Sequence, residues 1–368
     1  MKTRHDIFDL ISISRMYGAD SRYVLLGGGN TSRKIGEVMY VKASGCALSD
    51  IDETGFVAMS LPKLNAIWDK RYPENTKERE KEILHDMMEA RCQGETARPS
   101  VEALLHSIIP FTYVVHLHPA LVNGLTCSQS GKQSAASLFP DALWIPLVNP
   151  GYILAKTVRD ALQETGESTL IFLQNHGVFA GADTVGQIEH LYDSIMKKLN
   201  RSVVRKPIFT EVKVHAKRVK TVQTAMERFY GGPIKYPMVS NREIASRLVD
   251  EKSFYSLSSA YTPDHIVYSG FRPLWIPEKI FEAEQPVEAV LDALRLFEKK
   301  HGVTAKIIAV QKTSVFAISE AAMALFLDTV KIAAFTEGFG GPRFMDDEQI
   351  EFIRTWEVEQ YRANMSGK

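Results

Sequence analysis

Two histidines stand two residues apart in a short apolar segment. They are His116 and His118, in a stretch over residues 113–118 whose alternation predicts a strand. Side chains two positions apart on a strand point to the same face. The two imidazoles would therefore lie side by side, as two ligands of one metal ion do. The competing interpretation is a pair of sheet histidines with ordinary hydrogen bonds.

A third histidine follows another predicted strand. His176 comes just after the apolar segment 169–173 and just before Gly177. Ligands often lie where a strand ends in a loop. Taken alone, this residue is better interpreted as a turn histidine bonded to the backbone. Taken with the other two, it completes a set of three imidazoles that leaves one coordination position open, as a catalytic zinc requires.

An acidic side chain precedes these histidines. Glu102 begins a short apolar helix predicted over residues 101–109, with Ser100 as its expected N-cap. A carboxylate beside a metal ion can act as a fourth ligand or as a general base. The competing interpretation is a glutamate that stabilises the helix dipole. His106 lies on the same helical face, and we expect it to support or pack rather than to bind metal.

A glycine-rich segment, residues 27–34, could bind an anion. Its three consecutive glycines let backbone N–H groups approach a ligand closely, and Asn30, Thr31 and Ser32 add polar side chains. The segment has neither the Walker A spacing nor the dinucleotide-binding spacing. Most glycine-rich connections are tight turns, so the segment alone is weak support for a site.

Strands are expected on both sides of this segment. Residues 23–26 and residues 37–42 are apolar, and the pair predicts a hairpin with the glycine-rich segment as its connection. Ser44 and Gly45 come directly after the second strand. They could supply further hydrogen-bond donors to the same ligand.

The second half of the chain repeats a pattern of the first. Residues 158–182 and 290–319 both begin with Val-x-Asp-Ala-Leu, and both contain Gln-x-x-x-Val-Phe-Ala. In this alignment Thr313 stands at the position of His176, so the second copy lacks that histidine. The alternative is chance similarity, because helix, strand, turn and strand is a common order.

Other polar residues of the second half could contact a substrate. Asp264, His265 and Arg272 are candidates, although a structural role is favoured for His265 because it has no partner at ligand spacing. Tyr361 and Arg362, near the C-terminus, could close over an active site or lie on the surface of a helix, and the sequence favours neither.

Composition limits the classes of function. The 368 residues include 44 Lys and Arg and 44 Asp and Glu, so the formal net charge is zero. This balance argues against a general nucleic-acid or membrane-surface binder. The three cysteines predict neither a disulfide framework nor a zinc knuckle, and no segment has the character of a signal peptide or a membrane span. We expect a cytoplasmic protein with two domains, residues 1–205 and 206–368.

Together these motifs resemble the class II aldolase and adducin family. The shared order is Gly-Asn-Thr-Ser, Ser-Gly, Pro-Ser-x-Glu-x-x-x-His, His-x-His-Pro and Asn-His-Gly, over about residues 5–200. Residues 261–274 and 356–363 look like the aldolase part of bifunctional rhamnulose-1-phosphate aldolase/lactaldehyde dehydrogenase proteins. The sequence has no dinucleotide fingerprint, so we do not expect the dehydrogenase part of those proteins in these 368 residues.

The resemblance implies a role for each matching position. The three histidines would bind a divalent metal ion, usually zinc, with manganese or cobalt as alternatives, and Glu102 would be the catalytic acid/base. Phosphate or substrate contacts are implied for Gly29, Asn30, Thr31, Ser44, Gly45 and Ser100. Val101 departs from the family pattern, because some of these aldolases have a second serine there. One phosphate hydrogen bond would then be missing.

The implied activity is cleavage of a ketose 1-phosphate, of the rhamnulose- or fuculose-1-phosphate kind, to dihydroxyacetone phosphate and an aldehyde. Breaking the C3–C4 bond leaves negative charge on the C2 oxygen, which a metal ion stabilises as a Lewis acid. Epimerisation and dehydration of sugar phosphates use a similar site in the family, so they stay open. A non-enzymatic interaction module, as in adducin heads, is the alternative of another class. Retention of Glu102 and the three histidines argues against it.

The resemblance also implies an architecture. It is a three-layer α/β fold, with a mixed, largely antiparallel central sheet flanked by helices. A C-terminal α/β region would follow, as a degenerate repeat without metal ligands or as a source of substrate contacts. We expect a small-molecule sugar phosphate as ligand, a homo-oligomer, no nucleic-acid or membrane partner, and a separate dehydrogenase chain as a candidate partner.

Overall fold

The computed structural model describes residues 7–231 and 235–356. These residues form two compact units, each with its own sheet and its own apolar core. Within the described residues, the units comprise 7–126, 130–202 and 351–356 for the first, and 127–129, 203–231 and 235–350 for the second.

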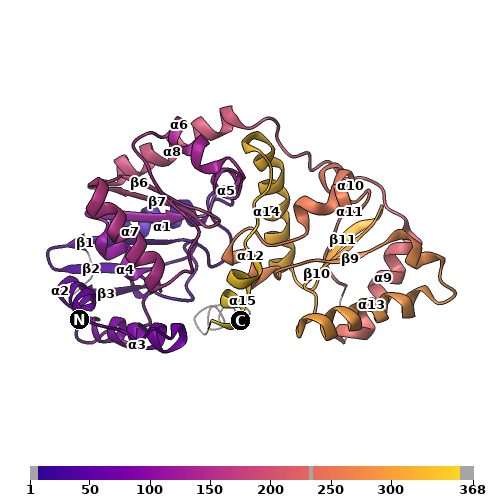
Figure 1. Cartoon of the computed structure of the whole chain (residues 1–368), viewed down its shortest axis with the longest axis horizontal. Helices are drawn as coiled ribbons and strands as arrows, with labels where there is room; N and C mark the ends of the chain where they lie inside the picture. Colours follow the sequence, from indigo (N-terminus) through magenta and orange to yellow (C-terminus); the bar gives the residue numbers. More distant parts are fainter. Residues whose placement is uncertain (1–6, 232–234, 357–368) are drawn as a thin grey trace. The chain divides into compact units, whose positions relative to one another are not determined.

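The first unit is built on a seven-stranded sheet with the order β3-β2-β1-β4-β7-β6-β5 (Figure 1). Its strands are β1 (Asn30–Ile35), β2 (Val38–Lys42), β3 (Phe56–Ser60), β4 (Tyr113–Leu117), β5 (Leu143–Ile145), β6 (Leu170–Leu173) and β7 (Gly177–Ala182). Strands β5 and β6 run parallel, and the other neighbouring pairs are antiparallel. The prediction of a mixed, largely antiparallel central sheet is confirmed.

Helices cover both faces of this sheet, which gives three layers (Figure 1). They are α1 (Phe8–Gly18), α2 (Leu61–Ala66), α3 (Thr76–Glu89), α4 (Ala103–Ile108), α5 (Ala120–Thr126), α6 (Gly131–Leu138), α7 (Tyr152–Thr165) and α8 (Val185–Ser202), with short 3-10 turns η2 (Glu53–Gly55) and η3 (Ile67–Asp69). Helices α4 and α7 pack on one face, in a core that includes Leu105, Val158 and Phe179. Helices α1 and α8 pack on the opposite face.

Strand β1 is polar and buried, and it departs from the predicted hairpin. No strand forms at residues 23–26, and β1 begins at Asn30, so the end of the glycine-rich segment lies inside the sheet. Asn30 and Ser32 face α4, whereas Thr31 faces α1, where its hydroxyl lies 2.7 Å from that of Ser14. Buried polar groups are stable where hydrogen-bond partners meet them. A search for apolar alternation cannot find a strand of this kind.

The second unit has a four-stranded sheet with the order β8-β11-β10-β9. Its strands are β8 (Met238–Val239), β9 (Leu274–Ile276), β10 (Ile307–Val310) and β11 (Ser314–Ala317). Its helices are α9 (Ala216–Tyr230), α10 (Arg242–Arg247), α11 (Glu251–Phe254), α12 (Pro263–Tyr268), α13 (Pro286–His301) and α14 (Glu320–Thr336), with turns η4 (Tyr255–Leu257), η5 (Glu278–Glu282) and η6 (Glu337–Phe339). Helix α15 (Asp347–Thr355) crosses the division between the units after Ile350. The predicted C-terminal α/β region is confirmed.

The two units share an order of elements. In the first unit, α4 and β4 are followed by short helices and then by β5, α7, β6, β7 and α8. In the second unit, α9 and β8 are followed by short helices and then by β9, α13, β10, β11 and α14. The pairing is also the same, because β5 is parallel to β6 as β9 is to β10, and a hairpin follows in both units.

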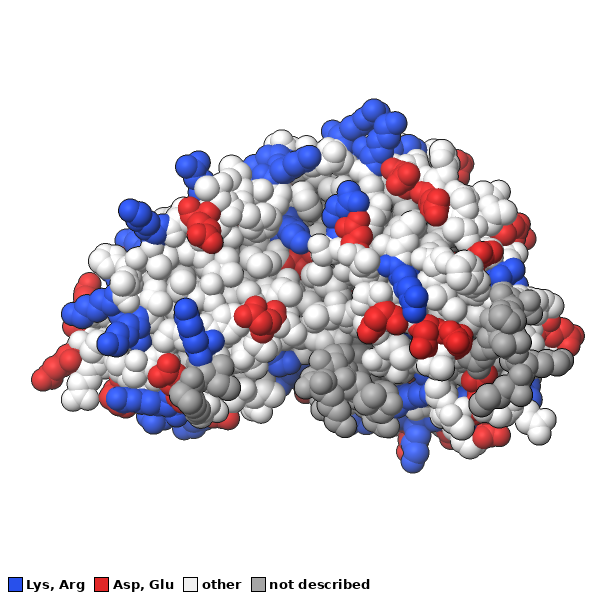
Figure 2. Space-filling model, turned by 180° about the vertical axis from the view of Figure 1, so that it is seen from behind, with Lys and Arg blue, Asp and Glu red and all other residues white. Residues whose placement is uncertain are grey.

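Both signs of charge occur on the surface. Lys and Arg side chains are interspersed with Asp and Glu side chains over the face shown in Figure 2, in keeping with the zero formal net charge. Among the described residues, no helix is both long enough and apolar enough to cross a membrane.

Candidate metal centre and acid/base site

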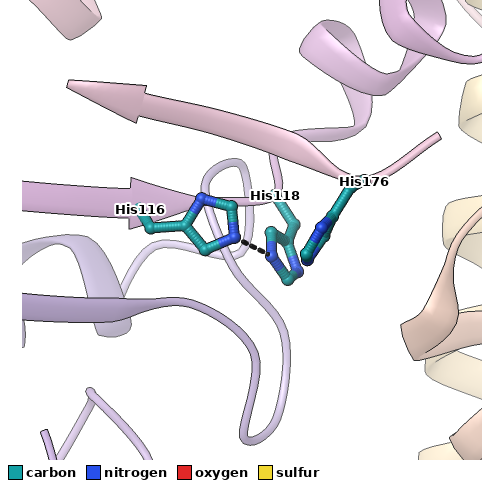
Figure 3. Close-up of side chains that lie close together, drawn as sticks. All are labelled: His116, His118 and His176. Carbon is teal, nitrogen blue, oxygen red and sulfur yellow. Dashed lines mark hydrogen bonds between the residues drawn. The ribbon is translucent and has the colours of Figure 1, made fainter. Parts of the chain in front are cut away.

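Strand β4 and the β6–β7 turn bring three imidazoles together (Figure 3). His116 lies in β4, His118 directly follows that strand, and His176 lies in the turn. One ligand nitrogen from each ring lies within 4.8 Å of the others, and the Nε2 atoms of His116 and His118 are 2.8 Å apart. Within the described ranges, this is the one cluster of three or more His, Cys, Asp or Glu side chains that could hold a metal ion.

His116 is oriented by contacts on the side away from the other rings. Burial holds its pKa well below the ordinary value, so the ring is neutral. Its Nδ1 lies 3.1 Å from the carbonyl oxygen of Val178. A carbonyl only accepts, so Nδ1 carries the hydrogen and Nε2 presents its lone pair. The ring stacks on Phe179 with centroids 4.0 Å apart. Such outer contacts set the orientation of a metal ligand.

Two glycines let the backbone close around the rings. A Cβ atom at Gly177 would lie 2.7 Å from the ring of His118, and one at Gly29 would lie 2.8 Å from the carbonyl oxygen of His116. Gly29 also has φ of +68°, which favours glycine. A larger residue at position 177 would displace the His118 ring, so glycine at this position is a packing requirement of the cluster.

Glu102, just before α4, points one carboxylate oxygen at the imidazoles. Its Oε1 is 3.5 Å from Nε2 of His116 and 3.6 Å from Nε2 of His176. This buried oxygen has no hydrogen-bond partner among the described residues. Burial acts to raise the pKa of Glu102, and the Asn30 amide, which donates to Oε2, acts to lower it. A buried anionic oxygen without a donor, beside three imidazoles, fits a divalent cation.

Two of the predicted phosphate-binding residues lie side by side near Glu102. The Ser44 N–H donates to the Arg98 carbonyl at 2.8 Å, and the Ser100 N–H donates to the Lys42 carbonyl at 2.9 Å. Ser100 was predicted as the N-cap of α4, but the helix begins one residue after Glu102, and the Ser100 hydroxyl accepts from the Glu102 N–H at 3.3 Å. Ser100 is therefore held next to Glu102, and Ser44 lies on the segment that pairs with the residues just before Ser100.

Of the other predicted phosphate-binding residues, the structure brings some to the site and places one side chain on the opposite face of the sheet. Asn30 is next to Glu102, to whose Oε2 its amide donates. Gly45 follows Ser44 with φ of +85°. The Thr31 hydroxyl lies on the opposite face of the sheet, so the structure does not bring that side chain to the site.

His265 lies in the second unit with its own buried partners. It is 1% exposed, its Nδ1 is 2.8 Å from the Thr262 hydroxyl, and its Nε2 is 3.6 Å from Oδ2 of Asp328. Asp264 is also buried in α12. These contacts within the unit are typical of a structural histidine.

The remaining candidates are on the surface or outside the described residues. Arg272 forms an exposed ion pair with Asp347, with N and O atoms 2.6 Å apart. Such pairs contribute little to stability. Tyr361 and Arg362 lie outside the described residues.

One residue that supports the cluster has no signal in the sequence. The Tyr192 hydroxyl, from α8, donates to the carbonyl oxygens of Val115 in β4 and Val178 in β7, at 2.9 and 3.3 Å. The Val178 carbonyl oxygen also accepts from Nδ1 of His116. The tyrosine therefore links β4, which carries His116, to β7, whose Val178 orients the His116 ring. In the sequence, Tyr192 is indistinguishable from an ordinary core residue of an amphipathic helix.

Comparison with known proteins agrees with this geometry. Residues 8–197 match the family described as Class II Aldolase and Adducin N-terminal domain, and the chain therefore belongs to this family. The match covers most of the first unit, including the histidine cluster and Glu102. Family membership supports an aldolase or lyase type of enzyme, for which a divalent metal ion is typical.

Several proteins are similar to parts of the chain. The "Uncharacterized oxidoreductase YuxG" of Bacillus subtilis (strain 168) is 29% identical over 186 residues, which are 48% of this chain and only 26% of that protein. The N-terminal class II aldolase domain of a conserved protein from Thermoplasma acidophilum has 26% identity and a TM-score of 0.48, over 55% of this chain and 95% of its own. An L-fuculose-1-phosphate aldolase from Thermus thermophilus has 15% identity and a TM-score of 0.36, over 52% and 93%.

Proposed function

We propose that the first unit is a metal-dependent aldolase that cleaves a ketose 1-phosphate, of the rhamnulose- or fuculose-1-phosphate kind, to dihydroxyacetone phosphate and an aldehyde. The observation that carries this proposal is the buried Oε1 of Glu102, which has no donor among the described residues and faces the nitrogens of His116 and His176. A merely structural glutamate at this depth would have a hydrogen-bond donor.

His116, His118 and His176 would hold the metal ion, which we propose is zinc, with manganese or cobalt as alternatives. A divalent cation bound there supplies Lewis-acid stabilisation of negative charge on a substrate oxygen. Nδ1 of His116, donating to Val178, keeps that ring in the tautomer whose Nε2 can bind. The rings are buried or half-buried, which limits competition from water.

Glu102 would be the acid/base. In the direction of synthesis it would remove a proton from C3 of dihydroxyacetone phosphate, and in the direction of cleavage it would return that proton. The carboxylate can accept that proton and return it, and its buried position next to the histidine cluster places it where the substrate carbon would lie. The Ser100 hydroxyl and the Asn30 amide fix the two ends of this residue.

The phosphate would bind next to Glu102. We propose that the Ser44 and Ser100 hydroxyls and the backbone N–H groups around Gly29 and Gly45 contact its oxygens. Asn30 can add its second amide hydrogen, because only one is used by Glu102. We leave the Thr31 side chain out of this set because it faces α1.

A product analysis tests this function. Protein loaded with zinc, manganese or cobalt is incubated with a panel of ketose 1-phosphates, and dihydroxyacetone phosphate and aldehyde are measured. The proposal expects both products in equal amounts from at least one ketose 1-phosphate. An epimer or a dehydrated product would instead support a sister reaction of the family. Bound metal without any conversion would favour an interaction module.

We further propose that residues 206–368 are a degenerate repeat of the catalytic domain, residues 1–205, without metal ligands. The shared order of elements and strand pairing supports this proposal. The resemblance also predicts that the chain forms homo-oligomers and associates with a separate dehydrogenase chain. Both stay predictions.

A further inference from the structure

Four buried side chains form one hydrogen-bonded series that ends at the acid/base. We infer that His106 and Ser32 are positioning residues that hold the Asn30 amide in one orientation, so that it fixes Oε2 of Glu102 and leaves Oε1 directed at the three imidazoles. The contacts are Ser32 Oγ to His106 Nδ1 at 2.7 Å, His106 Nε2 to Asn30 Oδ1, and Asn30 Nδ2 to Glu102 Oε2.

The series exists because a strand and a helix have matching repeats. Asn30 and Ser32 are two apart on β1, which places them on one face about 7 Å apart. Glu102 and His106 are four apart at the start of α4, about 6 Å along the helix. The two polar residues of the strand therefore face the two of the helix, so that Asn30 lies between Glu102 and His106 and Ser32 reaches His106. The four side chains are at most 8% exposed, so water cannot replace these contacts.

The direction of every hydrogen bond in the series follows from Glu102. An ionised carboxylate only accepts, so Asn30 must turn its NH₂ toward Glu102 and its oxygen toward His106. His106 must then carry its hydrogen on Nε2, and its Nδ1 must accept from the Ser32 hydroxyl. Burial lowers the pKa of His106 to about 3, so the ring is neutral and can accept at one nitrogen while donating at the other.

This arrangement gives His106 a task that packing alone would not require. Without its Nε2–H, the Asn30 oxygen would be buried with no donor, which is unfavourable. The amide would then rotate or shift, and Oε2 of Glu102 would lose its anchor. His106 contacts neither the imidazole cluster nor, on our proposal, the substrate. Its catalytic consequence rests on the proposed function, whereas the order of the hydrogen bonds does not.

The tautomer of His106 tests the hydrogen-bond order without any assay of activity. Full-length protein with ¹⁵N-labelled histidine is examined by long-range ¹H–¹⁵N correlation spectra, with and without zinc, and the His106 signals are assigned from their loss in His106→Gln. The inference expects one neutral ring with the hydrogen on Nε2. A hydrogen on Nδ1, a charged ring or an averaged pair of tautomers would overturn it.

Kinetics of the zinc-loaded variants test the positioning role. His106→Leu removes the donor, whereas His106→Gln places an amide N–H where it can still donate to Asn30. Loss of an outer contact of this kind typically costs about 10–100-fold. We expect His106→Leu to lower kcat by about that factor with little change in KM or zinc content, and His106→Gln to recover most of the rate. His85→Leu, an exposed position on α3, is the matched control and should not change either constant.

Two results would contradict the positioning role. Equal kcat for His106→Leu and wild type would show that the Asn30 amide does not need this donor. Equal loss in His106→Gln and His106→Leu, with both proteins folded by circular dichroism, would show that ring packing against Phe179 is what matters. If wild-type protein shows no aldolase activity while His106 still carries its hydrogen on Nε2, the proposed function fails and the hydrogen-bond order stands.

Discussion

The β6–β7 hairpin of the first unit and the β10–β11 hairpin of the second have nearly the same backbone and different chemistry. In each turn a residue has a positive φ, 56° at Asn175 and 50° at Lys312. A glutamine precedes this residue in each turn, and its N–H donates to a carbonyl oxygen at the end of the parallel neighbouring strand. The Gln174 N–H donates to Ile145 of β5 at 3.0 Å, and the Gln311 N–H donates to Ile276 of β9 at 2.9 Å. The residue after the one with positive φ is His176 in the first unit and Thr313 in the second.

The register of strand pairing makes β4 of the first unit equivalent to β8 of the second unit. His116 pairs with Phe179 in β7, and Met238 pairs with Phe316 in β11, within the same Val-Phe-Ala sequence. In the second unit, Met238 therefore stands at the position of His116 and Ser240, two residues later, at that of His118. Thr313 stands at the position of His176. Phe316 and Met238 pack in an apolar core with α9 and α13, where the first unit has an acid and imidazoles.

The two units have the same order of strands and helices but different interiors. The fold tolerates a polar interior in one unit, where the polar groups are hydrogen-bonded, and an apolar interior in the other. The first unit adds β1, β2 and β3 beside β4, and β1 supplies the polar side chains that meet Glu102 and His106. In the described part of the second unit β8 ends its sheet, so no strand takes this place.

The largest effect is expected from removing the acid that only the first unit has. Glu102→Gln keeps the size of the side chain but cannot accept a proton. We expect turnover of a ketose 1-phosphate to fall by about 10²–10⁴-fold, the usual range for an acid/base residue, while metal content is unchanged. Steady-state kinetics and metal analysis on the same sample check this. A variant with full activity would remove Glu102 from the mechanism.

Making the first hairpin resemble the second should abolish tight metal binding. His176→Thr places the residue of the second unit in the first. Loss of an outer partner already costs about 10–100-fold in metal affinity, so we expect loss of a ligand to cost more than about 100-fold. Competition titration with a chelator measures the change. Thr313→Ala is the matched control, and an equal loss in both variants would contradict the difference between the hairpins.

The reverse exchange tests whether the backbone of the second unit can hold three histidines as a metal site. Met238→His, Ser240→His and Thr313→His together place three imidazoles at the register of the first cluster. We expect a second ion to bind, more weakly than the first because no carboxylate is aligned with it. Metal titration followed by circular dichroism checks both binding and folding. A folded variant without a second ion would show that the two backbones differ more than their register indicates.

A smaller, pH-dependent effect is expected at the end of the polar strand β1. Lys34 donates to the carbonyl oxygens of Ile109 and Phe111, and burial lowers its pKa to about 7, partly opposed by Asp183. The unfolded lysine titrates near a pKa of about 10.4. Between these values the unfolded chain binds more protons, so stability rises with pH, whereas below about pH 7 the cost of burying the charge is fully present.

The matched variant for this effect is Lys34→Met, which keeps the chain length and removes the charge. From about pH 7 to about pH 9, we expect the free energy of unfolding of wild type to rise by about 2 kcal/mol relative to this variant. Urea unfolding at several pH values measures the difference. A constant difference across this range would show that the Lys34 ammonium stays charged in the folded protein.

The parts of the site that follow a periodic rule could be predicted from the sequence. His116 and His118 lie on one face because a strand has a repeat of two, and the three-layer architecture followed from the family resemblance. Strand β1 was missed because its buried residues are polar, and their partners in α4 lie more than 70 residues away. The equivalence of Met238 with His116 appears only through strand pairing, since these residues share no sequence motif. Leu-Trp-Ile recurs in β5 and β9 and is a further signal of the repeat in the sequence.

We propose that the first unit holds one metal ion and that the second unit, with the same order of elements, holds none. The direct measurement is the metal content per chain of purified wild type and of His116→Ala/His118→Ala, each after reconstitution with zinc, manganese or cobalt. We expect about one ion per chain in wild type and none in the variant. No metal in wild type, or metal retained in the variant, would contradict it.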